Sequence, residues 1–436
     1  MAVNVKLSCH VDRHINITLY IYDKHDDHLN VLSFIFTINT RISNMRGKYD
    51  VVKLFSNSKN QDSYVKVCAP MVRYSKVQFR TLVKNYGVDM CFTPMILADS
   101  FCQNSKARSS EFSTTENDYP LIAQFAANNI NDLLDATKLI YPYVDGVDLN
   151  CGCPQSWAMK DGYGSALLSK PERMYDLIRG IRNNLPSDLS VSVKIRILKD
   201  LRKTIDMCKQ LENCGATFLT VHGRTPNQKS TGEVNTDALE EVCSMVKIPI
   251  IANGGVKSLQ DANELFKSVN CDGVMVASGI LTNPALFSGT NRTPLSCIRL
   301  WIDLKNSAPN QITFQCYHHH LVFMLEKILN KQEKTVFNSL STFESVDEYL
   351  YANILNDTIP DMESNIIKMG NFVDCQYPEE ITLKHSSKCR GCNKSACYCI
   401  CNKYNSSVAD GKFFMDYVKV ADELDYMDSN MFDEPC

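Results

Sequence analysis

The chain has 436 residues, of which 44% are hydrophobic and 22% charged, and its formal net charge is −3 at pH 7. These values are ordinary for a soluble globular protein, and the length suits one large domain with additional segments. The N-terminus has neither a basic region followed by an apolar segment nor an acid-poor composition, and the early run Val31–Ile38 is too short to span a bilayer. We therefore expect a cytoplasmic protein that does not associate with membranes, with the nucleus as the alternative location.

The 19 cysteines are odd in number and lie in a long chain with no visible export signal, which favours a reducing compartment. Charge is unevenly distributed, because fourteen acidic and eight basic residues follow position 352. The part before that position is therefore net positive, which permits but does not require a nucleic-acid partner.

Residues 1–60 show no sustained period and are rich in Asn, Asp, His and Ser, which predicts an irregular N-terminal extension. From Val65 onward, short apolar runs alternate with helix-like amphipathic stretches such as the one that Pro171 and Glu172 open. The predicted strands are Val65–Met71, Val88–Met95, Leu121–Ala127, Val144–Asn150, Ser190–Ile197, Phe218–His222, Ile248–Asn253 and Asp272–Ala277.

Eight apolar strands that alternate with helices predict an α/β fold, a (β/α)8 TIM barrel over residues 61–290. A doubly wound open sheet is the alternative, but the Gly-rich dinucleotide turn after its first strand is absent.

Three helices are expected after the barrel, over Leu295–Leu304, Gln311–Leu329 and Val336–Tyr351. They predict a small helical bundle over residues 291–352. Residues 353–436 have mixed polarity and an acidic end, which predicts a separate and partly disordered tail. Five cysteines between Cys389 and Cys401 have spacings atypical of zinc ligands, so we expect no metal site.

Polar residues end seven of the eight predicted strands, where the chemistry of a (β/α)8 barrel takes place. One such residue alone is more often a packing or salt-bridge residue, but seven strand ends together indicate an active site. They carry Met71, Gln124, Asn150 with Cys153, Lys194 with Arg196, His222 with Arg224, Asn253 with Gly254 and Gly255, and Ser278 with Gly279.

Several of these ends suit a flavin. The glycines after Asn253 and Ser278 leave backbone N–H groups open to a phosphate, although they could equally serve only to make tight turns. Lys194 could place a cation at the edge of a flavin ring, and the Gln124 amide matches the imide-like edge of that ring. Arg196 and Arg224 are candidates for phosphate or base contacts, with salt bridging as the alternative.

Cys153 lies on a loop between Gly152 and Pro154, where we expect it to be outside the apolar layers and available for chemistry. Cys151 is two positions away, and the local spacing cannot choose between the two thiols.

The stretches Asp148–Pro154, Val221–Thr225, Ala252–Gly255 and Asp272–Ala277 resemble the tRNA-dihydrouridine synthases. Val67–Ser75 and Gln155–Met159 resemble the eukaryotic 4-like branch in particular, and the likeness runs from about residue 50 to 351. It implies an enzyme that uses FMN and NADPH to reduce uridines of the tRNA D-loop, at the 20a/20b pair by analogy. The cysteine immediately before Pro, here Cys153, would donate the proton to C5, and a hydride from flavin N5 would go to C6.

The same resemblance implies the residues that hold the cofactor. Ser278 departs from the family, which typically has Arg there, and losing a charge-assisted phosphate contact would cost about 1–3 kcal/mol. FMN contacts are implied at Pro70, Met71, Val72, Gln124, Lys194 and His222, and phosphate contacts at Asn253, Gly254, Gly255, Ala277 and Ser278. Apart from the resemblance, we expect substrate contacts at the strand-end residues Asn150, Arg196 and Arg224.

The helical bundle is the expected tRNA-docking module of a monomeric enzyme. Lys327, Lys331 and Lys334 would form one basic stripe on a helix, although Glu326 and Glu333 beside them fit an ordinary solvated face equally well. Two other functions remain open, namely an FMN-barrel reductase of a free pyrimidine and a catalytically weakened tRNA-binding homologue.

Overall fold

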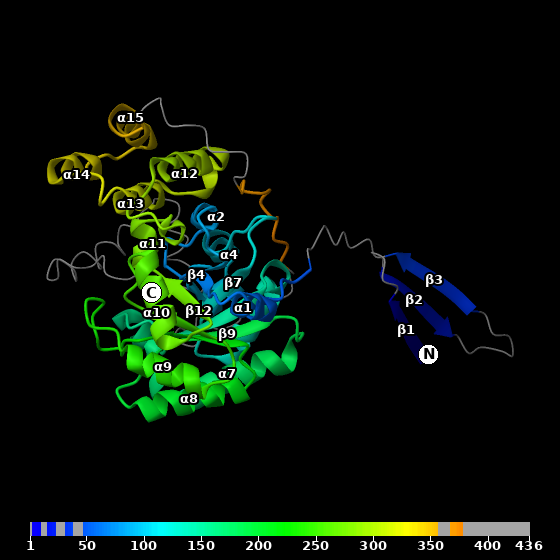
Figure 1. Ribbon diagram of the computed structural model, residues 1–436. Coiled ribbons are helices and arrows are strands. Elements are labelled where there is room, and N and C mark those ends of the chain that lie inside the picture. The colour runs from blue at the N-terminus through cyan, green and yellow to red at the C-terminus, as the bar shows by residue number, and fades with distance from the viewer. Residues whose placement is uncertain (1, 10–14, 23–30, 38–46, 356–366, 378–436) are drawn as a thin grey trace. The chain divides into compact units, whose positions relative to one another are not determined.

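The computed structural model describes residues 2–9, 15–22, 31–37, 47–355 and 367–377, in two compact units, Met1–Gly47 and Lys48–Cys436. The first unit contains an antiparallel sheet of β1 (Ala2–Cys9), β2 (Ile15–Tyr22) and β3 (Val31–Thr37), with β2 in the centre (Figure 1). The prediction of an irregular extension is therefore wrong for these strands. The alternation of apolar and other residues in β2, Ile-Asn-Ile-Thr-Leu-Tyr-Ile-Tyr, is the strand signal that the prediction missed.

The second unit contains the predicted barrel, whose eight strands are all parallel. Each pairs with its neighbour, and β5 pairs with both β4 and β7, which closes the barrel. A short additional strand, β6 (Ile96–Leu97), continues from β5 and pairs beside β7. The barrel strands are β4 (Val65–Cys68), β5 (Met90–Phe92), β7 (Leu121–Ala126), β8 (Gly146–Cys151), β9 (Ser190–Arg196), β10 (Phe218–His222), β11 (Ile250–Asn253) and β12 (Gly273–Val276).

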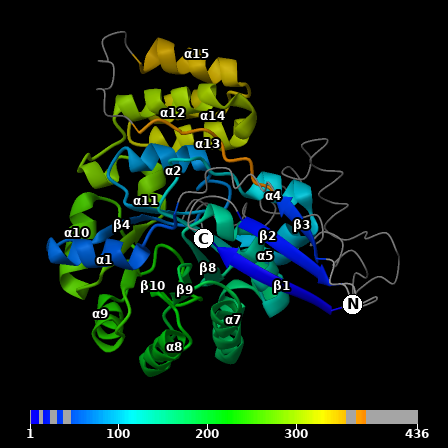
Figure 2. The ribbon, with the colours of Figure 1, turned by 90° about the vertical axis from the view of Figure 1, so that its right-hand side faces the viewer.

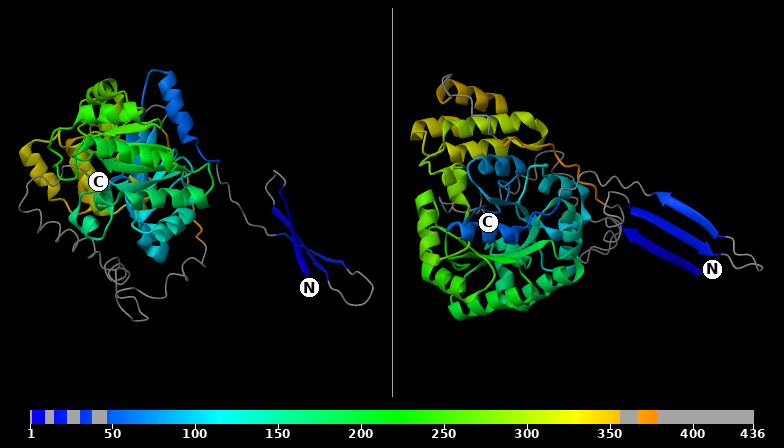
Figure 3. Two further views of the ribbon diagram at one scale, coloured as in Figure 1. Left: turned by 90° about the horizontal axis from the view of Figure 1, so that it is seen from below. Right: turned by 45° about the vertical axis from the view of Figure 1, so that its right-hand side comes forward.

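Helices surround these strands (Figure 3). Half of them begin at a side chain that caps their free N–H groups, such as Asn129, Asp200 and Ser258. They are α2 (Val77–Lys84), α3 (Ala98–Gln103), α4 (Ser105–Glu111), α5 (Ile130–Ile140), α6 (Ser156–Lys160), α7 (Pro171–Asn184), α8 (Leu201–Asn213), α9 (Thr236–Met245), α10 (Leu259–Val269) and α11 (Ser278–Thr282), with short 3-10 turns η1 (Tyr141–Tyr143), η2 (Gly164–Ser169) and η3 (Leu286–Ser288).

An additional helix, α1 (Val51–Asn60), closes the end of the barrel at which the strands begin. Its Phe55 is buried, with its ring centroid 5.4 Å from that of Phe218, the first residue of β10. Phe218 in turn lies 6.5 Å from the ring of Phe92. The predicted domain boundary at residue 60 is therefore wrong, because α1 belongs to the barrel core.

A buried cluster of charges braces α2 against the chain that leads into β7. Asp118 is fully buried and pairs with Arg80 at 2.6 Å and with Lys84 at 3.1 Å. Burial opposes ionisation of Asp118, but the two cations outweigh it and lower its pKa to about 2. Arg80 also donates to the carbonyl of Ser75, so the cluster fixes the end of the loop between β4 and α2.

Helices α12 (Leu295–Ser307), α13 (Phe314–Met324), α14 (Lys331–Asn338) and α15 (Phe343–Asn353), with the turn η4 (Pro309–Gln311), form the predicted bundle beside α2 and α11 (Figure 2). The expected helix Gln311–Leu329 is shorter than predicted, because Thr313 caps its start and it ends at Met324. Asn330 and Glu333 then form a capping box that starts a separate helix.

Contacts between α13 and the loop after β4 join the bundle to the barrel. His320 is fully buried, stacks on Phe79 at 4.4 Å and donates to the Tyr74 carbonyl at 3.1 Å. His318 bonds the Phe337 carbonyl and His319 the Tyr74 hydroxyl, so the three consecutive histidines make separate contacts.

Residues 367–377, orange in Figure 2, pack against the barrel, which corrects the prediction of a separate tail for this part of it. Val373 N donates to Thr114 O at 3.0 Å, and Glu116 N donates to Asn371 O at 3.1 Å. Tyr377 contacts the rings of Phe101 and Tyr143, with centroid distances of 5.9 and 6.0 Å. Cys389–Cys401 lie outside the described residues. Among the helices that are described, each is too short or too polar to cross a bilayer.

Phe55→Ala should lower the free energy of unfolding by about 3–5 kcal/mol, because it removes the aromatic plug at the closed end of the barrel. Urea unfolding followed by circular dichroism measures this change. The matched control is Val52→Ala on the same helix, where the side chain is 46% exposed and a change within about 0.5 kcal/mol is expected. Equal effects of the two substitutions would contradict the plugging role.

Asp118→Asn should cost about 3–5 kcal/mol, because it leaves two buried cations without their counter-charge. Since the folded pKa of Asp118 lies below the ordinary value of about 3.9, its contribution is present above pH 4 and disappears as the pH falls towards 2. Unfolding curves across that range should therefore converge for the variant and the wild type. Asp176→Asn, which breaks an exposed pair with Arg179, is the control and should leave the unfolding curves the same as those of the wild type.

Candidate active site

The polar residues of the barrel interior gather where the strands end. Register places Gln124 beside Asp148, Asp148 beside Ser192, and Asn150 beside Lys194. His222 lies beside Asn253 in the same way on β10 and β11. Because the opposite end of the barrel is filled by Phe55, Phe92 and Phe218, polar chemistry is confined to this end.

Four of these side chains form a buried hydrogen-bonded row. Ser192 Oγ donates to Asp148 Oδ1 at 2.7 Å, and Gln124 Nε2 donates to Asp148 Oδ2 at 2.8 Å. Asn150 Nδ2 then donates to Gln124 Oε1 at 2.8 Å. Burial raises the pKa of Asp148 to about 6, although the two hydrogen bonds and the nearby Lys194 act in the opposite direction.

The backbone of Cys153 is held on both sides. Asn150 Oδ1 accepts from the N–H groups of Gly152 and Cys153 at 3.2 and 3.0 Å. The Cys153 carbonyl accepts from both the N–H and the hydroxyl of Ser165 at 2.9 Å. Gly164, with φ of +58°, makes this approach possible, because a Cβ there would lie 2.6 Å from Cys153 O.

Cys151 and Cys153 occupy different surroundings. Cys151 ends β8 and is packed in the main core, where burial, followed by the charge of Asp148, raises its pKa well above the ordinary value. Cys153 is also buried, which corrects the prediction that it lies outside apolar layers. It belongs, however, to a separate small cluster with Met95, Ala126 and Ala158, against which Val72, Leu97, Trp157 and Tyr163 pack. The geometry therefore distinguishes the two thiols that local spacing left equivalent.

The cations at the strand ends are each directed by a neighbour. Lys194 Nζ donates to Asn253 Oδ1 at 3.0 Å, and Arg196 Nε donates to Gly152 O at 2.9 Å. Arg224 donates to the Gly232 carbonyl at 2.7 Å and approaches His222 Nε2 at 3.3 Å. Burial, together with these three cations, lowers the pKa of His222 well below its ordinary value, so this ring is neutral at pH 7.

The glycines after Asn253 have a steric role. Gly254 has a φ of +123°, and a Cβ there would lie 2.8 Å from His222 Cδ2. Gly255 also has a positive φ, +76°. The two glycines therefore do make a tight turn. Their positive φ angles also leave the backbone beside His222 without a side chain over it. Ala277 and Ser278, both half-buried, follow the adjacent strand β12, and Ser278 begins α11.

The loop after β4 carries Pro70, Met71 and Val72. Pro70 and Met71 are buried, whereas Val72 is half-buried and packs on the Cys153 cluster. Met71 N donates to Ser75 Oγ at 3.0 Å, which ties this loop to the cluster around Arg80 and Asp118.

The predicted lysine stripe is wrong. Lys327 lies in the turn after α13 and donates to Asn291 O at 3.4 Å, whereas Lys331 and Lys334 belong to α14. The capping box at Asn330 interrupts the helical spacing on which the stripe depended.

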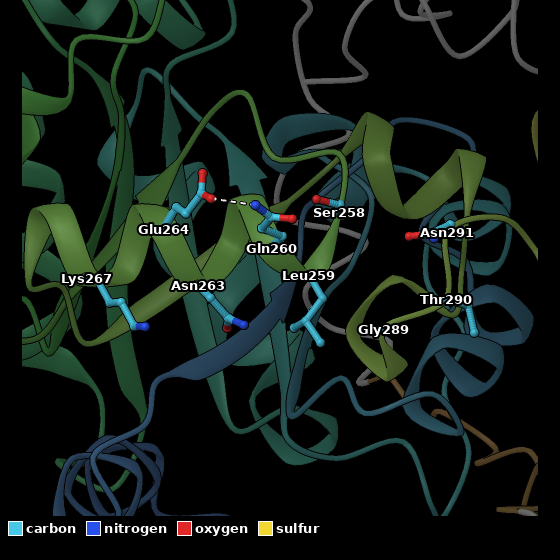
Figure 4. A pocket seen from close by; sticks show the side chains of 9 residues that line it. All are labelled: Ser258, Leu259, Gln260, Asn263, Glu264, Lys267, Gly289, Thr290 and Asn291. Atoms are coloured by element: carbon cyan, nitrogen blue, oxygen red, sulfur yellow. Dashed lines mark hydrogen bonds between the residues drawn. The ribbon is translucent and has the colours of Figure 1, made fainter.

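A surface pocket of about 500 Å³ lies outside this site, between α10 and the chain after η3 (Figure 4). Ser258, Asn263, Lys267 and Thr290 are among its lining residues, and none of the predicted site residues borders it. Its polar groups partly satisfy one another, since Gln260 Nε2 donates to Glu264 Oε1 at 2.8 Å.

Groups of three or more potential metal ligands do not occur among the residues that the structure describes.

Asp148, Ser192 and Ser165 are site residues that the sequence analysis did not name. Asp148 could have been found, because a charged residue two positions before Asn150 in an apolar strand must share the inward face. Ser165 gives no such signal, since only the folded turn brings it to Cys153.

Comparison with known proteins agrees with this architecture. The sequence model of the dihydrouridine synthase (Dus) family matches residues 67–358. The mouse protein named tRNA-dihydrouridine(20a/20b) synthase (NAD(P)+)-like is 49% identical over 304 residues, which are 70% of this chain and 92% of that protein. Its human counterpart is 46% identical over 304 residues, which are 70% of this chain and 94% of that protein. The Schizosaccharomyces pombe tRNA-dihydrouridine(20a/20b) synthase is 43% identical over 303 residues, which are 69% of this chain and 91% of that protein. The chain belongs to the dihydrouridine synthase family.

Proposed function

We propose that this protein reduces uridines in the D-loop of tRNA to 5,6-dihydrouridine, with FMN as its bound cofactor and NADPH as the reductant. The observation that carries the proposal is the Cys153 loop, held by Asn150 and Ser165 beside the polar end of the barrel. The relatives named for tRNA positions 20a/20b support those positions as the targets. A monomer in the cytoplasm remains our working assumption.

The residues at the strand ends fit a flavin. Lys194 offers a cation, the Gln124 amide offers a donor and an acceptor, and His222 offers a neutral ring, whose Nε2 Arg224 approaches. The open backbone at Gly254 and Gly255 suits a phosphate, for which Asn253, Ala277 and Ser278 are neighbours. FMN, when bound, supplies the hydride that NADPH delivers to it.

The protein's own contribution is to hold the uracil and supply a proton. The Sγ of Cys153 lies in a small apolar cluster, which limits the access of water to the thiol. The thiol would transfer its proton to C5 as a general acid while C6 receives the hydride. Arg196 and Arg224, fixed by backbone carbonyls, are candidates to orient the base, which must first leave its stack in the RNA.

Two other functions make different predictions. A reductase of free pyrimidines would turn over uracil without RNA, and a weakened tRNA-binding homologue would bind tRNA without product. The bundle α12–α15 favours a macromolecular substrate, because a small base needs no additional docking module. Incubation with NADPH and either unmodified tRNA or free uracil, followed by mass spectrometry of the products, distinguishes the three, because the weakened homologue gives product from neither.

Cys153→Ala should retain its flavin but lose dihydrouridine formation by at least about 100-fold, because the general acid is removed. The measurement is the nucleoside assay under single-turnover conditions. Cys243→Ser, on α9 and half-buried, is the matched control and should stay within about twofold of wild type. Undiminished product from Cys153→Ala would exclude the thiol as the proton donor.

Gly254→Ala should weaken FMN binding by about tenfold, because a side chain at this positive φ is strained and its Cβ would meet His222. Titration of flavin-free protein with FMN, followed by quenching of flavin fluorescence, measures the affinity. Gly47→Ala is the control, since its Cβ would meet nothing within 4 Å. Equal affinity of both variants would place the flavin elsewhere.

A further inference from the structure

The hydrogen bonds that join Asn150, Gln124 and Asp148 in the buried row all donate towards Asp148, and Ser192 donates to Asp148 from the other side. An ionised carboxylate only accepts hydrogen bonds, whereas each amide has one end that donates and one that accepts. Since Asp148 accepts from Gln124 Nε2, Gln124 must turn its Oε1 towards Asn150. Asn150 must then present Nδ2 to Gln124, which leaves Oδ1 for the N–H groups of Gly152 and Cys153.

We propose that Asp148 is a positioning residue, whose carboxylate sets the orientation of the Gln124 and Asn150 amides and thereby the backbone of the Cys153 loop. The role of the row in catalysis rests on the proposed function, but the orientation itself can be tested without flavin or RNA.

The geometry favours this role over simple filling of space. Asp148 and Gln124 are both buried, so a reversed amide could not exchange its lost partner for water. If Gln124 were reversed, its Nε2 would face Asn150, and Asn150 would have to turn Nδ2 towards two N–H groups that also donate. The carboxylate of Asp148 and the two N–H donors at the other end of the row therefore allow one orientation of the amides only.

Ser192 gives the row one adaptable end. Its hydroxyl donates to Asp148 Oδ1 but can also rotate and accept. Asp148→Asn alone can therefore keep the orientation of Gln124 if Ser192 reverses, and we expect only a small effect of that single substitution.

Asn150→Asp is the severe single substitution. It places a second carboxylate on the other side of Gln124, whose amide can donate at only one end. One carboxylate oxygen, facing Gln124, then lacks a donor in a buried site. We expect the melting temperature to fall by at least about 3 °C, and the amides of Gly152 and Cys153 to exchange with solvent about tenfold faster.

Asp148→Asn combined with Asn150→Asp reverses the row and satisfies every group in it. The new amide at position 148 accepts from Ser192 and donates to Gln124 Oε1. Gln124 Nε2 donates to the new carboxylate at position 150, which still accepts from Gly152 and Cys153. The double variant should therefore be more stable than Asn150→Asp alone.

The experiment compares the wild-type full chain with the two single variants and the double variant, all free of flavin and RNA. Thermal unfolding gives the melting temperature, and hydrogen exchange with mass spectrometry reports the peptide that contains Gly152 and Cys153. Recovery of at least half of the Asn150→Asp losses in the double variant is the expected result. Additive losses, failure of the double variant to fold, or an Asn150→Asp variant that behaves as wild type would overturn the proposal.

Flavin titration of the same variants separates this inference from the proposed function. In the double variant the Gln124 amide is reversed, so its match to a flavin ring should be lost, and FMN affinity should remain about tenfold below wild type while stability recovers. Recovery of stability together with full FMN affinity would preserve the role of Asp148 in the row but remove Gln124 from the flavin contacts.

Discussion

Closure of the sheet through β5, which pairs with both β4 and β7, is the constraint from which the site follows. Once the sheet is closed, alternate residues of every strand must enter one narrow interior. The interior can hold polar groups only where they satisfy one another or reach a ligand. Aromatic side chains fill the interior at the end that α1 covers. Amide, carboxylate and cationic side chains occupy the other end.

The Cys153 loop depends on this arrangement without being part of a strand. β8 ends at Cys151, and Asn150 folds its side chain over the next two N–H groups. This turn ends the alternation of the strand, so two thiols two residues apart come to lie in different apolar clusters. The charge of Asp148, the amides and the thiol loop are thus successive parts of one hydrogen-bonded structure.

The sequence predicted the positions of the barrel strands well because most of them are rich in apolar, β-branched residues, and the bounds predicted for β10 are the observed ones. It could not choose between Cys151 and Cys153, because the turn that separates them is made by a side chain. The break between α13 and α14 was readable in principle, since Asn330 and Glu333 have the spacing of a capping box. The partnership of Arg80 with Asp118 could not be read, because 38 positions separate these residues and only the folded chain brings them together.

The segment 367–377 has a consequence for how the domain is delimited. The match to the family model ends at residue 358, yet the outer layer of the barrel is completed by residues that follow it. A fragment cut at the end of the likeness would uncover the rings of Phe101 and Tyr143 and leave backbone groups at Thr114 and Glu116 to water. The packed outer layer of the barrel therefore extends past the residues that the family model matches, through Tyr377.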